Sequence, residues 1–478
     1  MSLLKAAALA SLALLFAPPA QAKAPGQAPA SPLAHEAYTL DNGLTVLLKR
    51  DPSTPMVAVD IWYHVGALHE RPGRSGFAHL YEHMMFEGSE HVEAGEIWFQ
   101  LTRVGAALIN ASTTFDRTNY FEVVPGFNLE MALWLESDRM GFLLDAVDQK
   151  LFEIEKKIVK NERRQRLENT PYGLADERAW KALFPAPHPL HHQVIGSMDD
   201  LEAATIDDVR AFYTQWYTPS NAVLTLVGNF ELEETKALIQ KYFGSLPTLP
   251  KPKGPEVTPI RLKEEVVIRH DETVATVPAL TFYWHGPAPY AEGDAAGTLT
   301  AHALAGYPGA RLDRALVREG GLATSVQAGF VPVGTQSLFI IQAVARPGVS
   351  TDTLAAAIDA ELEGLRAEGI SAAELQRGVA AIETQALLSF DGVGGLLQVA
   401  ETLQGYQQAF GAGDRLAWDL QRHQAVTPAQ AQAFAQTWLP RDRRVVLHAV
   451  PPSAAAPTAP TPAEPAAAAQ PAPMKEAP

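Results

Sequence analysis

The sequence contains no cysteine. This absence excludes disulfide bonds and a thiol nucleophile, and it argues against a lipid anchor attached to a cysteine. No serine stands in a G-x-S-x-G setting, so a hydrolase with that nucleophile motif is not indicated. A chain of 478 residues is long enough to bury a large hydrophobic core, and the fold must depend on that core.

Basic charge is also scarce, because the formal net charge is -16. Nucleic-acid binding needs a basic surface, so a nucleic-acid partner is not expected. The acidity either favours basic peptides as ligands or simply keeps the protein soluble. No segment offers roughly 18 consecutive apolar residues, so no transmembrane segment is expected.

The N-terminus has the features of a bacterial signal peptide over residues 1–22. Lys5 precedes a short apolar stretch from Ala6 to Phe16, and the small residues around Ala20 and Ala22 form a candidate cleavage site. We therefore expect a periplasmic or secreted protein.

Both ends of the mature chain are rich in alanine and proline. Residues 23–34 and the tail 451–478 lack the apolar side chains that a core requires. We expect both segments to be disordered.

A pattern of helix, proline and strand occurs twice between these ends. Each copy has a capping threonine, a phenylalanine and a tryptophan on the helix, a proline and then an apolar strand. The copies are Thr205, Phe212, Trp216, Pro219 and 222–227, and then Thr427, Phe434, Trp438, Pro440 and 445–450. The pattern predicts an α+β fold of two homologous α/β-sandwich domains, each a sheet covered by helices. Chance similarity between amphipathic segments is the alternative.

A proline-rich segment divides the two copies. The predicted organisation is a first domain at 35–245, a linker at 246–259 and a degenerate second domain at 260–450.

The most informative motif is His79-Leu80-Tyr81-Glu82-His83, an H-x-x-E-H sequence. The flanking apolar residues Phe77, Leu80, Met84 and Met85 predict a helix, on which His79 and His83 share one face. Two imidazoles on one face can hold a single zinc ion, with Glu82 beside them as a candidate base. A chance match between ordinary, partly buried histidines is the alternative.

A catalytic zinc needs a third protein ligand, and the predicted helix at 151–164 offers three glutamates. Glu155 and Glu162 are seven residues apart, so they point the same way. Helical periodicity does not choose between Glu153, Glu155 and Glu162.

These motifs and their order resemble the pitrilysin family of zinc peptidases, which includes insulin-degrading enzyme and the mitochondrial processing peptidase. In that family, H-x-x-E-H is followed by a zinc-binding glutamate with a second glutamate seven residues before it, as in Glu162 and Glu155. The stretch Asn110-Ala111-Ser112-Thr113 resembles an edge strand of the family. The match runs from about residue 38 to residue 450.

The resemblance implies a role for each matching residue. His79, His83 and Glu162 would bind one Zn²⁺ per chain, and Glu82 would activate the water. Glu155 would assist catalysis by steadying a histidine or the water. The ligand types would also suit manganese or cobalt.

The same resemblance implies that Asn110 and Ala111 face a substrate peptide added to the sheet edge.

The second domain departs from the family pattern. Family members often carry an arginine and a tyrosine here that contact substrate and stabilise the oxyanion, but this chain has Val317 and Thr324 at those positions. Arg318 is one position away, and the lone His302 has no glutamate at the required spacing. A threonine hydroxyl is too short to replace a phenol in reach.

We therefore expect a heterodimer, in which a homologous zinc-less subunit supplies the arginine and tyrosine. This chain would be the zinc-bearing subunit and form half of a clamshell chamber. The function expected is a zinc-dependent endopeptidase acting on short or unfolded peptides. A non-catalytic assembly or scaffold subunit of the same fold is the alternative.

Overall fold

The structure is a computed structural model that describes residues 31–452. The predicted signal peptide at 1–22 lies outside the described residues. So do most of the predicted disordered segments at 23–34 and 451–478.

The first half of the chain is built on a six-stranded sheet in the order β1-β2-β6-β3-β5-β4. Only β2 and β6 are parallel, and every other neighbouring pair is antiparallel. Strands β3 and β6 lie in the middle and are almost wholly buried, which explains their mostly apolar sequences. The strands are β1 (Glu36–Thr39), β2 (Thr45–Arg50), β3 (Met56–Tyr63), β4 (Leu108–Thr113), β5 (Thr118–Pro125) and β6 (Ala222–Gly228).

Most helices of the first half pack on this sheet and on one another around one large core. The predicted helix is present as α1, which contacts β4 and β5. Its residues Phe77, Leu80 and Met84, and Met85 directly after it, are buried in this core. The helices are α1 (Phe77–Met84), α2 (Glu96–Arg103), α3 (Leu129–Ala146), α4 (Gln149–Arg163), α5 (Gly173–Leu183), α6 (Met198–Ala203), α7 (Ile206–Trp216) and α8 (Leu232–Phe243). A π-helical turn, Arg164–Glu168, continues α4.

The second half repeats this design with a five-stranded sheet in the order β7-β11-β8-β10-β9. Here β11 is parallel to β7 and antiparallel to β8, just as β6 is parallel to β2 and antiparallel to β3. The strands are β7 (Val266–Asp271), β8 (Ala279–Gly286), β9 (Ala323–Val333), β10 (Gln336–Ala345) and β11 (Val445–Val450). The helices are α9 (Asp294–Ala305), α10 (Thr351–Glu368), α11 (Ala372–Leu388), α12 (Gly392–Phe410), α13 (Leu416–Gln424) and α14 (Pro428–Trp438).

The predicted fold class, two domains that each combine a sheet with covering helices, is confirmed. The helix–proline–strand repeat corresponds to α7 with β6 and α14 with β11, and both helices begin with the expected threonine capping box. No helix or strand lies between Phe243 and Val266, and the predicted linker at 246–259 falls inside this segment. The domain boundaries themselves stay a prediction.

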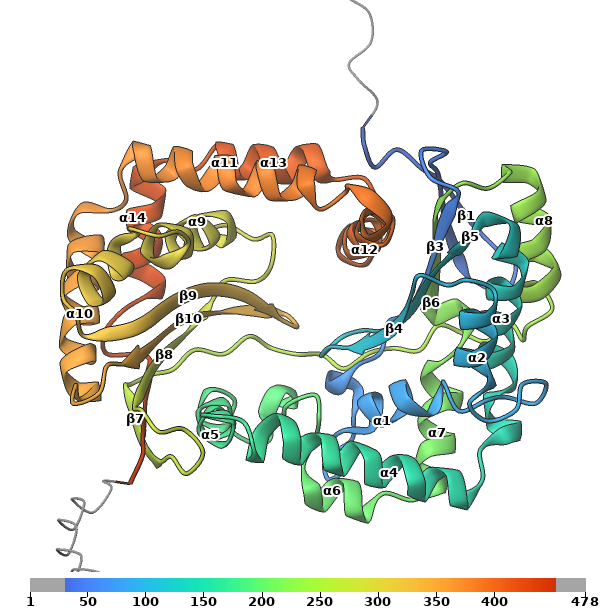
Figure 1. Ribbon diagram of the computed structural model, residues 1–478, viewed down its shortest axis with the longest axis horizontal. Helices are drawn as coiled ribbons and strands as arrows, with labels where there is room; N and C mark the ends of the chain where they lie inside the picture. Colours follow the sequence, from blue (N-terminus) through green and yellow to red (C-terminus); the bar gives the residue numbers. More distant parts are fainter. Residues whose placement is uncertain (1–30, 453–478) are drawn as a thin grey trace, which may run out of the picture.

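Each half also lends one helix to the other half's sheet. Helix α12 packs on β3, β5 and β6 of the first sheet, and α5 packs on β7 and β11 of the second sheet (Figure 1). The two sheets are therefore sandwiched between helices from both halves. Within residues 31–452, no helix is long and apolar enough to cross a membrane.

Candidate metal centre and active-site cleft

Helix α1 carries the whole H-x-x-E-H motif, and a buried carboxylate holds its first turn. The N-cap residue, Gly76, has a φ of 89° and no side chain to cap the helix. The side chain of Glu70 caps the helix instead. Its carboxylate accepts hydrogen bonds from the backbone N–H groups of Gly76 at 2.9 Å and Ala78 at 2.8 Å. Burial raises the pKa of Glu70 to about 8, and the backbone N–H groups oppose this rise.

The two histidines of the motif share one face of α1, as the four-residue spacing predicts. Their ring centroids lie 4.9 Å apart. His79 is buried, whereas about a quarter of the His83 side chain is exposed. The apolar residues of the helix point into the core, so the imidazoles turn toward α4.

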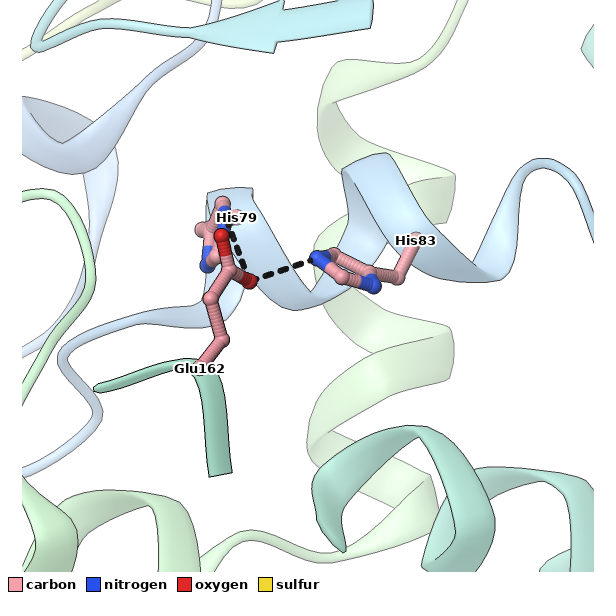
Figure 2. Close-up of side chains that lie close together, drawn as sticks. All are labelled: His79, His83 and Glu162. Atoms are coloured by element: carbon pink, nitrogen blue, oxygen red, sulfur yellow. Dashed lines mark hydrogen bonds and ion pairs between the residues drawn. The ribbon is translucent and has the colours of Figure 1, made fainter. Parts of the chain in front are cut away.

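Glu162, near the end of α4, places its carboxylate between the two rings (Figure 2). Its Oε2 atom lies 3.5 Å from His79 Nε2 and 3.1 Å from His83 Nε2. One ligand atom from each of the three residues lies within 4.8 Å of the others. The structure thus brings together the three residues predicted to bind zinc.

The distances from the Glu162 carboxylate to the two imidazoles fit zinc. A tetrahedral zinc ion with bonds of about 2.0–2.1 Å separates its ligand atoms by about 3.3 Å. The two carboxylate–imidazole distances, 3.5 and 3.1 Å, lie on either side of that value. Two imidazoles and one carboxylate also form a donor set that leaves a fourth position open for water or substrate.

The protonation states of the two histidines differ. Burial lowers the pKa of His79 to about 4, so its imidazole is neutral and able to bind a metal. Burial also acts to lower the pKa of His83, but hydrogen bonds to Glu155 and Glu162 outweigh it and raise the pKa to about 9. A metal that binds His83 must therefore displace a proton.

Glu155 lies on the far side of the His83 ring from Glu162. Its Oε2 atom is 3.6 Å from His83 Nδ1, and its side chain is buried. This is the arrangement in which a carboxylate orients a metal-binding histidine through the ring nitrogen that does not bind the metal. The helical spacing of seven residues places both glutamates on the α4 face toward α1.

Glu82 points from α1 toward strand β4. The hydroxyl of Thr113 donates a hydrogen bond to Glu82 Oε2 at 2.5 Å. Burial raises the pKa of Glu82, and the Thr113 hydrogen bond opposes this rise. Thr113 has no role in the sequence-based prediction, although it belongs to the same edge-strand motif as Asn110 and Ala111.

His79 and Glu82 open onto a cleft with a volume of about 420 Å³. The edge strand β4 forms one wall, and the other wall comes from the π-helical turn, α5 and residues 193–195. Phe115 and Trp180 stack in this cleft with ring centroids 5.2 Å apart.

The two residues predicted to contact substrate lie differently relative to this cleft. Ala111 lines it, together with Ser112 and Thr113. Asn110 is exposed outside the cleft, and its side-chain oxygen accepts the N–H of Ala111 at 2.9 Å. Successive residues of a strand face opposite sides, so Ala111 and Thr113 share a face that Asn110 does not.

The second half offers no arginine–tyrosine pair at the expected positions. Val317 packs against the core of the second half, and the Thr324 hydroxyl donates to the backbone oxygen of Val344 at 3.2 Å. The neighbouring Arg318 pairs with Asp313 at 2.6 Å. Across residues 31–452, His302 belongs to no metal-binding group, and the group of His79, His83 and Glu162 stands alone.

Comparisons with known proteins identify the family of this chain. Residues 45–176 match the family model described as insulinase (peptidase family M16), and residues 203–382 match the M16 inactive domain. The chain is 32% identical over 352 residues to the zinc protease PqqE of Helicobacter pylori, covering 72% of this chain and 77% of that protein. It is 27% identical over 415 residues to an uncharacterized zinc protease of Streptomyces coelicolor, covering 84% of this chain and 87% of that protein.

Solved structures show the same fold. A protease from Helicobacter pylori matches with a TM-score of 0.80 and 26% identity, over 87% of this chain and 99% of that chain. The periplasmic protease PqqL from Escherichia coli matches with a TM-score of 0.71 and 20% identity, over 87% of this chain but 47% of that chain. As the pitrilysin-type resemblance predicts, the chain belongs to peptidase family M16, the insulinase family.

Proposed function

We propose that this protein is a zinc-dependent endopeptidase in which His79, His83 and Glu162 hold the metal and Glu82 is the general base. The observation that carries the proposal is the convergence of three zinc-type ligand atoms within 4.8 Å, beside a cleft that Glu82 also lines. The membership of the M16 family and the zinc proteases among the relatives support it.

Zinc held by these side chains supplies a Lewis acid that polarises the scissile carbonyl and makes water more acidic. Glu82 takes a proton from that water and passes it to the leaving amine. Its buried position suits this role, because burial raises the pKa of the carboxyl and makes it a better base. Thr113 holds one carboxylate oxygen, and Glu155 orients His83 from behind.

The substrate peptide is proposed to add to the free edge of β4 as a further strand. β4 is the last strand of the first sheet, and its Ala111, Ser112 and Thr113 line the cleft beside Glu82. Backbone pairing at this edge would bring a scissile peptide alongside the metal ligands. Asn110 is proposed to shield the Ala111 N–H until a peptide arrives, because its side chain accepts that hydrogen.

The active enzyme is proposed to be a two-chain assembly, with this chain as the zinc-bearing subunit. Neither Val317 nor Thr324 can stabilise an oxyanion from its observed place, so a second, homologous chain would supply the arginine and tyrosine. The predicted signal peptide and the periplasmic location of PqqL support a periplasmic or secreted protein.

Cleavage of a quenched peptide library tests the proposal. Zinc-loaded wild type and Glu82→Gln are compared, each alone and with periplasmic extract of the source organism, and zinc content is measured in both. We expect the variant to keep its zinc and lose cleavage, and wild type to cleave fully only with extract. Bound zinc without Glu82-dependent cleavage in either setting would instead favour an assembly subunit.

A further inference from the structure

We infer that Arg166 binds a carboxylate group of the peptide substrate, an inference that rests on the proposed peptidase function. The group is either an acidic side chain or the C-terminal carboxylate of the peptide. Arg166 would then select substrates at the metal centre itself, from the zinc-bearing chain.

Arg166 lies on the π-helical turn that follows the metal-binding end of α4. Its Nη2 atom is 2.7 Å from Oε1 of Glu162, whose other oxygen faces the two histidines. Its side chain is 67% exposed and lines the cleft with His79 and Glu82. The guanidinium is therefore close to the place where the peptide bond would be cut, yet it is open to a ligand.

The Arg166 guanidinium has N–H donors that its ion pair with Glu162 does not use. An arginine side chain offers five N–H donors, and across the described chain, residues 31–452, Glu162 is the one ion-pair partner found for Arg166. A planar guanidinium of this kind binds carboxylates through paired hydrogen bonds. Leu167 and Trp180 beside it provide apolar surface for the rest of a bound side chain.

The charge around the cleft also favours a carboxylate. Among the described residues that line it, Arg166 is the only lysine or arginine, and Glu82 is the only carboxylate. An acidic group that enters the cleft therefore has a single cationic side chain to bind, apart from the proposed zinc ion. A basic group has no free acidic partner there except the proposed general base.

The same turn contains a matched control. Arg164 is exposed and carries the same charge, but its side chain bonds to Asn161 at 2.7 Å and does not line the cleft. A general effect of removing positive charge from this turn would appear with either arginine. Loss of a carboxylate-binding group in the cleft would appear only when Arg166 is substituted.

Peptide binding is the test, measured by fluorescence anisotropy on the zinc-loaded Glu82→Gln protein so that turnover does not interfere. Each labelled peptide carries glutamate or glutamine at one position, and each is made with a free or an amidated C-terminus. The binding proteins are Glu82→Gln alone and Glu82→Gln combined with Arg166→Gln, Arg166→Lys or Arg164→Gln. Zinc content is measured in all of them.

We expect one carboxylate to strengthen binding about tenfold, as a charge-assisted hydrogen bond does. Arg166→Gln should abolish this preference and leave the uncharged peptide within about twofold, whereas Arg164→Gln should keep the preference and Arg166→Lys should keep part of it. Preference for glutamate over glutamine identifies a side chain as the source, and preference for the free terminus identifies the C-terminal carboxylate.

No carboxylate preference, or one that survives Arg166→Gln, would overturn the inference. Equal weakening of charged and uncharged peptides would also overturn it, because Arg166 would then act only by holding Glu162. Hydrolysis by the wild type is measured separately. Cleavage without acidic selectivity therefore rejects the inference alone. Selective binding with no cleavage, either by the chain alone or with periplasmic extract, rejects the proposed function alone.

Discussion

Replacement of Glu70 tests how the helix that carries the predicted zinc ligands is held. The Glu70 side chain is fully buried, and its two oxygens accept the N–H groups of Gly76 and Ala78. At acidic pH Glu70 is protonated, and its hydroxyl oxygen can still accept a backbone N–H group, whereas the amide nitrogen of glutamine cannot. Glu70→Gln therefore loses one of these hydrogen bonds. A buried donor left without a partner costs about 1–3 kcal/mol. The variant should therefore be less stable than wild type at acidic pH.

The difference between the two proteins should depend on pH. Burial raises the pKa of Glu70 from its ordinary value of 4.5 to about 8 in the folded protein. The folded state therefore binds this proton more tightly than the unfolded state, and the resulting stability is complete below pH 4.5 and lost as the pH rises to 8. The loss is about 1.4 kcal/mol per pH unit in that window, and about 5 kcal/mol in all. Glutamine does not titrate, so the variant lacks this dependence.

Urea unfolding at pH 5.5 and 7.5, followed by tryptophan fluorescence, measures the effect. Between these two pH values, wild type should lose about 3 kcal/mol relative to Glu70→Gln. The same substitution at the exposed Glu93 is the control, and it should leave the pH dependence of wild type unchanged. A stability difference between wild type and Glu70→Gln that stays constant with pH would refute the argument.

Three further predictions concern the same site. Thr113→Val removes a hydrogen bond to the Glu82 carboxylate, and because that hydrogen bond lowers the Glu82 pKa, its loss should raise this pKa. The acid limb of the kcat/KM profile should then move to higher pH, whereas Thr113→Ser should leave it in place. Gly196 has a φ of 74°, and Gly196→Ala would place a Cβ atom 2.5 Å from the backbone of Gly76. This substitution should lower the free energy of unfolding by at least about 2 kcal/mol. The control Gly73→Ala has a similar φ of 76° but meets no atom within 4 Å, so in urea unfolding it should cost about 1 kcal/mol. Chelation of the metal should lower Tm as well as activity. The reason is that zinc at 1,000 times its Kd stabilises the folded state by about 4 kcal/mol. An unchanged Tm in calorimetry would contradict a metal site formed by the folded state.

Helical periodicity alone was sufficient to predict part of the candidate site from the sequence. The four-residue spacing of His79 and His83 predicts a shared face whatever the rest of the chain does, because the helix geometry is local. The choice among the glutamates of α4 is different, because it depends on which of them meets α1. Glu153 points to Lys156 on its own helix, whereas Glu155 and Glu162 both reach His83. At the level of the sequence, only the resemblance to the family selected Glu162 as the predicted zinc ligand among the three glutamates.

The contacts made by loops and edge strands were beyond the sequence-based prediction. Glu70 precedes α1 by a loop, and Thr113 comes from a strand that reaches Glu82 only after the sheet has formed. Strand alternation did contain one usable signal, since Ala111 and Thr113 must share a face that excludes Asn110. The sequence contains no comparable signal that α5 and α12 each cover the sheet of the other half. An amphipathic pattern shows that a helix has a buried face, but it does not show which of two sheets that face covers.

The position of Glu162 connects the metal centre to both halves of the protein. Its neighbour Arg163 is buried, and its Nε donates to the backbone oxygen of Gly196 at 2.9 Å. Gly196 lies against Gly76, where α1 begins, so this contact fixes α4 relative to the histidines. The other end of the guanidinium, Nη2, bonds to Glu177 of α5 at 2.8 Å, and α5 covers the sheet of the second half. The second half contains none of the predicted metal ligands, yet through its contacts with α5 it helps to position one of them. A movement of α5 with the second sheet would shift Arg163 first and then Glu162.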